Sequence, residues 1–312
     1  MDYMKGRHKY KESIIKNNYE VINCEECGYW HVYPMPTEEE LNTFYESKYY
    51  ESIGDNRTMT DKLYDPDGFY TIQYEDRLRN LMEIFPSHLP KTVLDIGAGY
   101  GDFLRFMKKH GWETQGLEPS RQAFELIKDR EILNVYYGSI YELSDLNFKL
   151  ASLVTLNNVL EHLRDPRKAL EIVKKHVIMP ESILCIVVPN DFNLLQELLM
   201  KTVLKNNTEK QYPWINPPEH LNYYSIKTLK EFLVKCGFRI LYLTTDFPME
   251  FFPLMGLDYI THPEVGRNAH LKRVQFEKYL YETNSLEFKD KLFESFARIE
   301  IGRDIRVFIT HK

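Results

Sequence analysis

A glycine-rich segment and two Glu-His pairs are the parts of this sequence whose residue types can do chemistry. Gly97, Gly99 and Gly101 follow an apolar run in the segment "TVLDIGAGYGDFL". Glycine lets the backbone turn sharply and approach a ligand closely, because no Cβ stands in the way. The two pairs are "EH" at 161–162 and "EH" at 219–220, and histidine is the side chain that most often moves a proton in catalysis. The sequence therefore predicts a ligand-binding loop accompanied by proton-transfer groups.

These residues need a scaffold that brings strand ends together, and the pattern from about residue 92 onward predicts one. Short β-rich runs alternate with helical windows, and we expect strands at 92–96, 113–118, 135–138, 150–156, 183–188, 239–245 and 303–310. Strands separated by helices form a parallel sheet with right-handed crossovers. In such a doubly wound α/β domain the ligand lies beyond the carboxyl ends of the strands. The glycine loop and both Glu-His pairs are expected there.

Two regions fall outside this alternation. Residues 1–74 are polar and tyrosine-rich, and we expect an N-terminal extension there, followed by the main domain over 75–312. Residues 247–300 separate the last two expected strands and contain a helical pattern. An insertion at this place commonly becomes a lid or a binding wall. Its basic residues, which include "HLKR" at 270–273, suit either phosphate binding or a solvated helix face.

The spacing of the glycines narrows the choice of ligand. The dinucleotide fingerprint is G-x-G-x-x-G, and here the third glycine comes one residue early. Glu118 stands about twenty positions further on, where dinucleotide sites place an acidic residue that binds ribose hydroxyls. A carboxylate there accepts from two hydroxyls and repels a 2′-phosphate. We therefore expect a ribose-bearing ligand other than NADP, and the early glycine counts against an NAD-dependent oxidoreductase.

Four segments together resemble one enzyme family. "VLDIGAGYG" resembles motif I of the class I S-adenosylmethionine (SAM)-dependent methyltransferases, and "GLEPS" resembles their second motif. "YGSIYEL" (137–143) is similar to the adenine-contacting loop of that family, and "LNNVLEHLRDP" (156–166) to its segment after the fourth strand. The segments occur in the family's order, each at an expected strand end. The resemblance implies a Rossmann-like seven-stranded sheet and SAM as the cofactor.

The same resemblance implies a set of cofactor contacts, namely Asp95, Gly97, Gly99, Gly101, Glu118, Pro119, Ser139, Ile140 and Asn157. Asp95 anchors the glycine loop, and Asn157 lies where the methionyl end passes. Ser139 stands where many relatives carry an aspartate for the adenine amino group, so adenine contacts are expected from backbone groups and Ile140. Arg77 either pairs with the methionyl carboxylate or lies on a solvated helix face.

The acceptor side is implied by a further resemblance. "PPEHLNYYSIKTLKEFLVKCGF" is similar to a segment of methyltransferases that act on sugars and other small molecules. It implies that His220 removes the acceptor's proton while Glu219 orients the ring or raises its basicity; the alternative is that His220 braces the loop. The residues expected to contact substrate are Tyr50, His162, Tyr223 and Tyr224.

These resemblances predict a SAM-dependent methyltransferase that acts on a small hydroxylated metabolite, namely a nucleotide-linked sugar or an envelope glycan precursor, in carbohydrate biosynthesis. The alternative within enzymes is O-methylation of a carboxylate or phenol on another small molecule or a peptide. A carboxylate acceptor needs no general base. The alternative of another class is a non-catalytic SAM-binding or interaction module.

The cysteines carry a weaker signal. The segment around "NCEECGYW" resembles the second half of a zinc ribbon that precedes many of these methyltransferase domains. A structural zinc site needs four ligands, and Cys24 and Cys27 form the only C-x-x-C. Cys185 falls in an expected strand and Cys236 at a helix end, while His8 and His31 are irregularly spaced. We expect a degenerate remnant and no bound metal.

Composition excludes several other classes. Among 312 residues, 43% are hydrophobic and 28% are charged, and the net charge is −6. An acidic protein is a poor match for a phosphate backbone, so we expect no nucleic-acid partner. The longest apolar runs have the length of a strand, which predicts no membrane span. Four cysteines without a paired framework and no apolar leader near the start predict a cytoplasmic protein.

Overall fold

The computed structural model describes residues 8–44, 68–127, 129–207 and 210–311. Within these ranges the strands form two sheets, one of seven strands and one of four. Tyr50, an expected substrate contact, lies outside the described residues. None of the helices in the described ranges combines the length and the apolar character needed to cross a membrane.

The seven-stranded sheet confirms the expected Rossmann-like arrangement. In spatial order its strands are β10 (Phe238–Thr245), β11 (Asp304–His311), β8 (Ile178–Pro189), β7 (Ala151–Asn157), β4 (Thr92–Ile96), β5 (Glu113–Glu118) and β6 (Val135–Tyr137). Every expected strand is present, although β8 begins at Ile178 rather than at residue 183. The strands from β6 to β8 are parallel, and the largely apolar sequences of β4, β7 and β8 suit a sheet covered on both faces.

The last strand departs from the expected parallel order. β11 lies antiparallel to both of its neighbours, β8 and β10. β10 ends at Thr245, which pairs with Ile305 at the start of β11. Because the insertion returns the chain to the edge that it left, the final strand must run the opposite way. As a result Asp246 and Asp304 meet at the carboxyl edge of the sheet.

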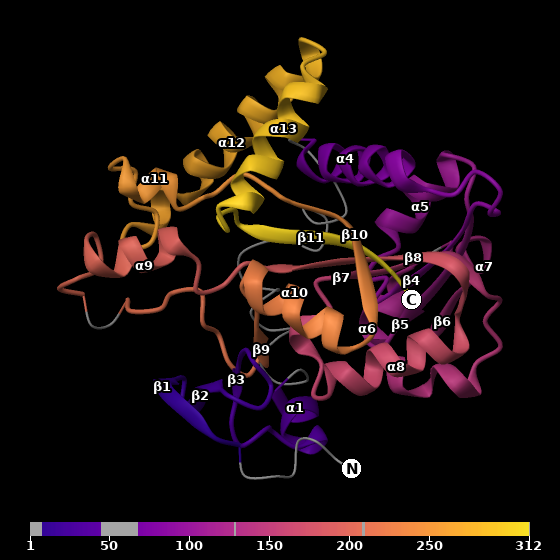
Figure 1. Ribbon diagram of the computed structural model, residues 1–312, viewed down its shortest axis with the longest axis horizontal. Coiled ribbons are helices and arrows are strands. Elements are labelled where there is room, and N and C mark those ends of the chain that lie inside the picture. The colour runs from indigo at the N-terminus through magenta and orange to yellow at the C-terminus, as the bar shows by residue number, and fades with distance from the viewer. Residues whose placement is uncertain (1–7, 45–67, 128, 208–209, 312) are drawn as a thin grey trace.

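Helices cover both faces of the large sheet (Figure 1). One face carries α4 (Phe69–Ile84), α5 (Asp102–Lys109) and α13 (Leu286–Arg298), with α12 (Gly266–Glu282) beside α4 and α13; the other carries α8 (Pro166–His176) and α10 (Ile226–Lys235). The shorter helices are α1 (Glu38–Phe44), α6 (Arg121–Leu126), α7 (Arg130–Leu133), η2 (Ile140–Asp145), η3 (Leu160–His162), α9 (Leu194–Lys201), α11 (Phe251–Leu254) and η4 (Pro263–Val265).

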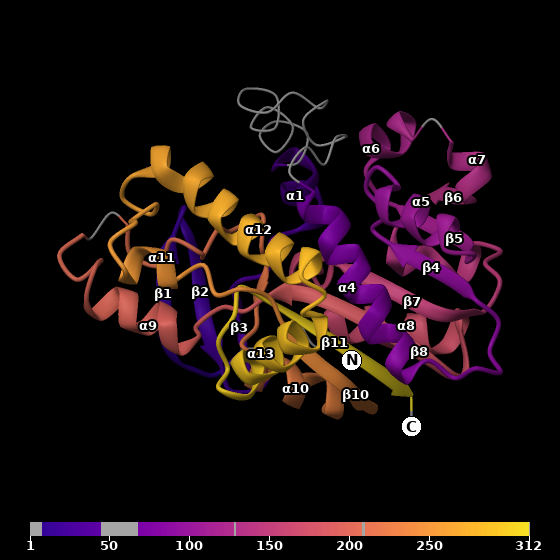
Figure 2. The same cartoon turned by 90° about the horizontal axis from the view of Figure 1, so that it is seen from above.

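Two expectations about domain organisation meet different outcomes. The expected insertion at 247–300 is helical, since it contains α11, η4, α12 and α13. The expected boundary between residues 74 and 75 falls inside α4, which is one continuous helix. Figure 2 shows α4 crossing the molecule beside α12. The main domain therefore begins with α4 and not in its middle.

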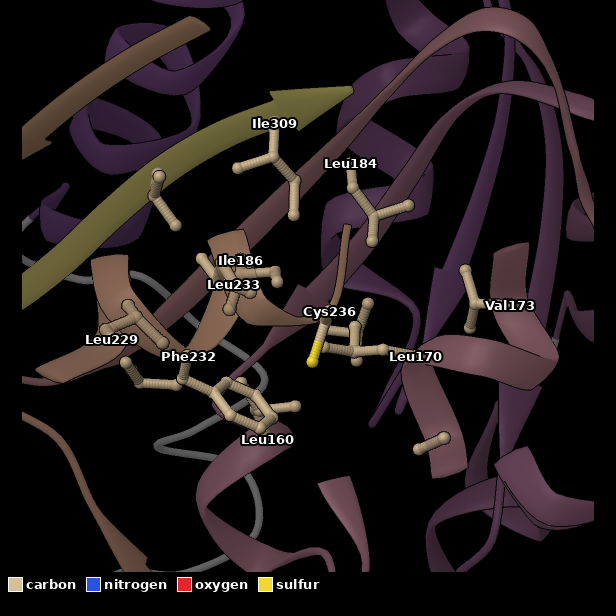
Figure 3. Close-up of a cluster of buried hydrophobic side chains, with 14 of the residues drawn as sticks. Leu160, Leu170, Val173, Leu184, Ile186, Leu229, Phe232, Leu233, Cys236 and Ile309 are labelled. Carbon is tan, nitrogen blue, oxygen red and sulfur yellow. The ribbon is translucent and has the colours of Figure 1, made fainter. Parts of the chain in front are cut away.

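The face of the sheet that α8 and α10 cover holds the larger apolar core. Figure 3 shows Ile186 of β8, Leu170 of α8 and Phe232 of α10 within one cluster. Cys236, at the end of α10, belongs to the same cluster, and Cys185 is buried on the other face of β8. Both cysteines are core residues. Burial of apolar surface, worth about 25 cal/mol per Å², holds the strand ends in fixed positions.

The N-terminal extension is joined to the main domain by a shared four-stranded sheet. β1 (Tyr10–Lys16), β2 (Tyr19–Cys24) and β3 (Trp30–Val32) are paired in sequence order, and β9 (Asn222–Tyr223) adds the fourth strand. Trp30 lies opposite Tyr223, and His31 lies opposite Asn222. The extension therefore holds the segment that directly follows His220.

A buried cluster of charges attaches the insertion to the main domain. Lys289 of α13 is 1% exposed and forms ion pairs with Asp76 of α4 and Glu277 of α12; the Glu277 carboxylate lies 2.9 Å from its Nζ. Nearby, Arg79 of α4 pairs with Asp290 of α13 at 2.6 Å. Helix α4 is thereby fixed to the two long helices of the insertion.

Replacement of Lys289 by methionine is expected to lower the free energy of unfolding by about 3–5 kcal/mol, because Asp76 and Glu277 would be left buried without their cation. Lys291→Met is the matched control, since Lys291 lies on the same helix but forms an exposed pair with Glu287. Its loss should leave the free energy of unfolding nearly unchanged, because exposed ion pairs contribute little. Urea denaturation followed by circular dichroism measures both, and equal stabilities would show that the buried cluster adds nothing.

Candidate active site

A cavity of about 260 Å³ lies at the carboxyl edge of the large sheet. Its walls come from the loop after β4, from helix α4, and from the ends of β7, β10 and β11. The lining includes Gly97, Gly99, Tyr70, Tyr74, Arg77, Asp95, Asn157, Asp246, Asp304 and Arg306. This is the place where a doubly wound sheet binds its ligand.

The first two glycines of the loop form one wall of the cavity. Gly97 has a φ of +78°, and a Cβ there would meet the Val159 side chain at 2.5 Å, so the position requires glycine. Gly99 has a φ of +55°, and no described atom lies within 4 Å of where its Cβ would stand, which leaves the backbone open to a ligand. Gly101 instead packs against Leu133 and begins α5. It does not contribute to the described lining.

Glu118, at the end of β5, holds the loop in shape. Its carboxylate accepts hydrogen bonds from the N–H groups of Gly99 at 2.6 Å and Ser120 at 2.7 Å. Burial raises the pKa of Glu118 to about 7, and the two backbone N–H groups oppose that rise. Each carboxylate oxygen has a further lone pair for a hydroxyl. The residue thus supports the loop, a role that the sequence analysis missed, and its expected contact with ribose stays a prediction.

The residues expected around adenine lie outside the described lining. Pro119 is exposed on the surface. The Ser139 hydroxyl caps η2 by accepting from the N–H of Tyr141 at 3.3 Å, and Ile140 is buried in the apolar core. Their expected contacts with adenine stay predictions.

A buried chain of hydrogen bonds links β4, β7 and α4 beneath the cavity. Asp95 accepts from the Thr155 hydroxyl at 2.5 Å and from the Asn157 side-chain amide at 3.0 Å. Asn157 in turn accepts from the Arg77 guanidinium at 2.6 Å. Burial raises the pKa of Asp95 to about 7, against the Thr155 hydrogen bond and the charge of Arg77. Asp95 and Asn157 therefore line the cavity as parts of one network.

Arg77 is not on a solvated helix face, which settles one alternative that the sequence left open. Its side chain is buried, and its guanidinium lies over the rings of Phe103 at 5.0 Å and Tyr74 at 5.7 Å. Burial lowers its pKa, so an anionic ligand in the cavity would restore favourable electrostatics. This wall suits a carboxylate.

The opposite wall is acidic, and the sequence analysis did not find it. Asp246 follows β10 and Asp304 begins β11, and the N–H of Asp304 donates to the Asp246 carboxylate at 2.7 Å. Burial, followed by the charge of Asp304, raises the pKa of Asp246 to about 7, while Arg273 lowers it. Arg273 is itself buried and pairs with Asp246 at 3.4 Å, so it is not a free phosphate ligand. The sequence signal that could have identified Asp246 was its position directly after the expected strand at 239–245.

The two expected histidines form a pair beside this cavity without lining its described part. The rings of His162 and His220 meet edge to face with centroids 4.9 Å apart. Burial, followed by the charges of His162 and Arg303, lowers the pKa of His220 to about 3. Glu161 is buried beneath them, with one carboxylate oxygen 3.8 Å from His162 Nε2. His220 is therefore neutral at physiological pH and only weakly basic.

Glu219 is not among the groups that shift the pKa of His220, and the expectation that it orients the ring or raises its basicity stays a prediction. Its backbone carbonyl accepts from His162 Nδ1 at 2.5 Å, and its carboxylate accepts from the Asn216 side chain at 2.5 Å. The His220 main-chain N–H donates to the Asn216 carbonyl at 3.1 Å. These bonds fix the loop that carries His220, because they close it into a turn.

Tyr223 and Tyr224 pack rather than line the described cavity, which corrects their expected contact with substrate. The Tyr223 hydroxyl donates to the His220 carbonyl at 2.8 Å. Tyr224 is 1% exposed and lies between Tyr29 and Phe232, with ring centroids 4.8 and 5.9 Å away. Both are held in place by the small sheet that β9 joins, so they brace the loop from behind.

Comparison with known proteins identifies the family to which the chain is similar. A family model described as a methyltransferase domain matches residues 70–243, which is more than half of the chain. No curated protein matches the chain.

Solved structures share the fold. The plantazolicin methyltransferase BamL, in complex with a triazolic desmethylPZN analog and SAH, is 14% identical with a TM-score of 0.52 over 86% of this chain and 92% of that chain. BpumL, another plantazolicin methyltransferase, is 15% identical with a TM-score of 0.52 over 87% and 94%. A SAM-dependent methyltransferase from Archaeoglobus fulgidus is 22% identical with a TM-score of 0.47 over 76% and 93%. At these identities the likeness to BamL and BpumL concerns the fold alone.

Glu118→Ala is expected to weaken binding of S-adenosylhomocysteine by about 1.5–3 kcal/mol, because hydrogen bonds to a charged group are lost. Isothermal titration calorimetry measures the effect, and thermal unfolding of the variant reports its loss of loop support separately. Glu113→Ala is the control, since Glu113 is an exposed residue at the other end of the same strand. Unchanged affinity in Glu118→Ala would remove the residue from the ribose contact, and tight binding of NAD would refute the expected cofactor.

Proposed function

The chain belongs to the family of methyltransferase domain proteins, and we propose that it transfers a methyl group from SAM to a hydroxyl group of a small polar metabolite. The acceptor that we propose is a sugar hydroxyl, carried by a nucleotide-linked sugar or an envelope glycan precursor.

One observation carries this proposal, namely that one cavity brings the glycine loop and Arg77 together with a pair of aspartates, Asp246 and Asp304. Arg77 suits the amino-acid end of SAM, since a buried guanidinium pairs with a carboxylate, and the open backbone at Gly99 leaves room for the rest of the cofactor. We assign Glu118 to the ribose hydroxyls and Asn157 to the methionyl end. The opposite wall, with Asp246 and Asp304, faces the acceptor.

The acidic wall supports a hydroxyl acceptor and disfavours a carboxylate one. Carboxylates accept hydrogen bonds and cannot donate them when ionised, so Asp246 and Asp304 bind hydroxyl groups well. An acceptor carboxylate beside Asp246 and Asp304 would be repelled by each of them that is ionised. A compound with several hydroxyl groups satisfies more of this wall than a phenol does.

Asp246 is the base that this geometry favours. When bound, SAM supplies a methyl group that its sulfonium activates. As the acceptor oxygen takes that methyl group, the hydroxyl proton passes to the Asp246 carboxylate. A base works best when its pKa lies near the operating pH, and the pKa of Asp246 is about 7. His220, with a pKa of about 3, is the weaker base and stands outside the described lining, so it is the alternative.

Asp246→Asn is expected to lower kcat by about 10²- to 10⁴-fold, the usual contribution of a positioned base, while the affinity for S-adenosylhomocysteine stays near wild type. His220→Ala is the parallel variant, and its kcat should fall less. Steady-state kinetics of both variants, with calorimetry for the cofactor, measures this. A large loss in His220→Ala beside full activity in Asp246→Asn would assign the base to His220.

The pH–rate profile separates the same two residues. Asp246 must be ionised to accept a proton, so kcat should rise as pH increases through about 7 and then level off. The Asn variant should lose this rise. His220 is already neutral well below that range, and a profile that is flat from pH 5 to pH 8 in the wild-type protein would contradict Asp246 as the base.

The acceptor class is tested by turnover of labelled SAM with a panel of nucleotide-linked sugars, free glycosides, phenols and carboxylates. We expect methyl transfer to sugar hydroxyls, seen as a methyl ether by mass spectrometry. Formation of a methyl ester would establish the carboxylate alternative. Cofactor binding without turnover on any acceptor would support the non-catalytic alternative.

A further inference from the structure

Four side chains that are far apart in the sequence converge in the N-terminal extension. His8 precedes β1, Cys24 ends β2, Cys27 lies in the turn after it, and His31 lies in β3. All four are buried, and their ligand atoms lie within 4.8 Å of one another. Two sulfur and two nitrogen atoms are the donor set that divalent zinc prefers in structural sites.

The spacing of the four ligand atoms fits a tetrahedral ion. His8 Nδ1 lies 3.1 Å from Cys24 Sγ, 3.2 Å from His31 Nε2 and 3.6 Å from Cys27 Sγ. With Zn–S bonds of about 2.3 Å and Zn–N bonds of about 2.0–2.1 Å, neighbouring ligands of a tetrahedral site stand about 3.3–3.8 Å apart. A small contraction or expansion of the present arrangement is enough to hold the ion.

The proton positions favour a metal over a purely hydrogen-bonded cluster. His31 Nδ1 lies 2.8 Å from the Val32 carbonyl, which can only accept, so His31 carries its proton there and turns a bare Nε2 toward His8. Metal-binding histidines are commonly oriented in this way, by a hydrogen bond from the ring nitrogen that does not bind the metal. His8 Nδ1 faces that bare Nε2 and the sulfur atoms of Cys24 and Cys27, and a single proton on His8 can serve only one of these three contacts. A cation satisfies all four groups at once.

The turn and the charge also suit zinc. The Cys27 N–H donates to Cys24 Sγ at 3.3 Å, and Gly28, with a φ of +81°, closes the turn by donating to the Cys24 carbonyl at 2.9 Å. Backbone N–H groups aimed at sulfur stabilise a thiolate. Two thiolates balance the charge of one Zn²⁺, so the loaded site is neutral, as a buried site requires.

We infer that His8, Cys24, Cys27 and His31 bind one structural zinc ion. This reverses the expectation of a degenerate remnant without metal, because the two histidines supply the ligands that a second cysteine pair would otherwise give.

The ion would support the loop that carries the histidine pair. His31 lies opposite Asn222, and the Val32 N–H donates to the Leu221 carbonyl at 2.9 Å. The Leu221 N–H continues to the Glu161 carbonyl at 2.8 Å, and the Asn222 side chain donates to the Leu163 carbonyl at 2.7 Å. A metal bound at His31 would therefore be separated only by β9 from the segments that carry His162 and His220.

Metal content of the full-length protein tests this inference. Elemental analysis after dialysis is expected to find about one zinc per chain in the wild-type protein. Replacement of zinc by Co²⁺ should give the visible bands of a tetrahedral ion and a thiolate charge-transfer band, and X-ray absorption of the zinc form should show two sulfur and two nitrogen neighbours.

Matched variants locate the ion. Cys24→Ser and His8→Ala should lose the zinc, whereas Cys236→Ser, which changes a cysteine of the apolar core, should keep it. His162→Ala is a second control, because Glu161, His162 and His220 form another group whose ligand atoms lie close together. If Cys24→Ser fails to fold, the absorption spectra of the wild-type protein still test whether a metal is bound by two sulfur and two nitrogen atoms.

Two results would overturn the inference. One is wild-type protein that contains no zinc and takes up neither Zn²⁺ nor Co²⁺. The other is zinc that persists in Cys24→Ser and His8→Ala but disappears in His162→Ala, which would place the metal at the histidine pair.

Discussion

The buried carboxylate of Asp95 is the group on which the rest of the site depends. It ends β4 beneath the glycine loop, and its hydrogen bonds to Thr155 and Asn157 tie that strand to β7. Burial of a carboxylate costs free energy unless hydrogen bonds compensate for it. Asp95 therefore needs both of these partners. Through Asn157 the chain of bonds reaches Arg77 of α4. Two central strands and one helix thus share a single polar network that opens onto the cavity.

The insertion gives the cavity its second wall. Because it returns to the sheet at the edge it left, β11 runs antiparallel and brings Asp304 to Asp246. Lys289 secures the same insertion to α4 through buried ion pairs. Asp246 and Asp304 on one side and Arg77 of α4 on the other are therefore held around the same cavity by buried ion pairs of the insertion.

The N-terminal extension acts on the main domain through backbone pairing. β3 accepts β9 as a neighbour, and β9 directly follows the loop with His220. Tyr223 and Tyr224 point into the packing around this small sheet, so the loop is supported from behind rather than lined by these rings. The four zinc ligands that we infer lie in the same sheet and the turn beside it.

The sequence by itself determined the parts of this protein that depend on local pattern. Alternating apolar runs located all seven strands of the large sheet, and the positions of Gly97 and Gly99 followed from what a tight turn beside a ligand requires. Strand positions and glycine turns depend on residues only a few positions apart, so local periodicity and backbone freedom are enough to predict them. The resemblance of four segments to one family then predicted the cofactor.

Only the tertiary structure decided how distant segments meet. The direction of β11, the pairing of Asp246 with Asp304, and the approach of His8 to Cys24 each join residues separated by long stretches of chain. Tyr224 was misplaced for the same reason, since its burial depends on Tyr29 from the extension. Which surfaces pack together depends on the summed burial of many side chains, and no local pattern in one segment records the partner that another segment will supply.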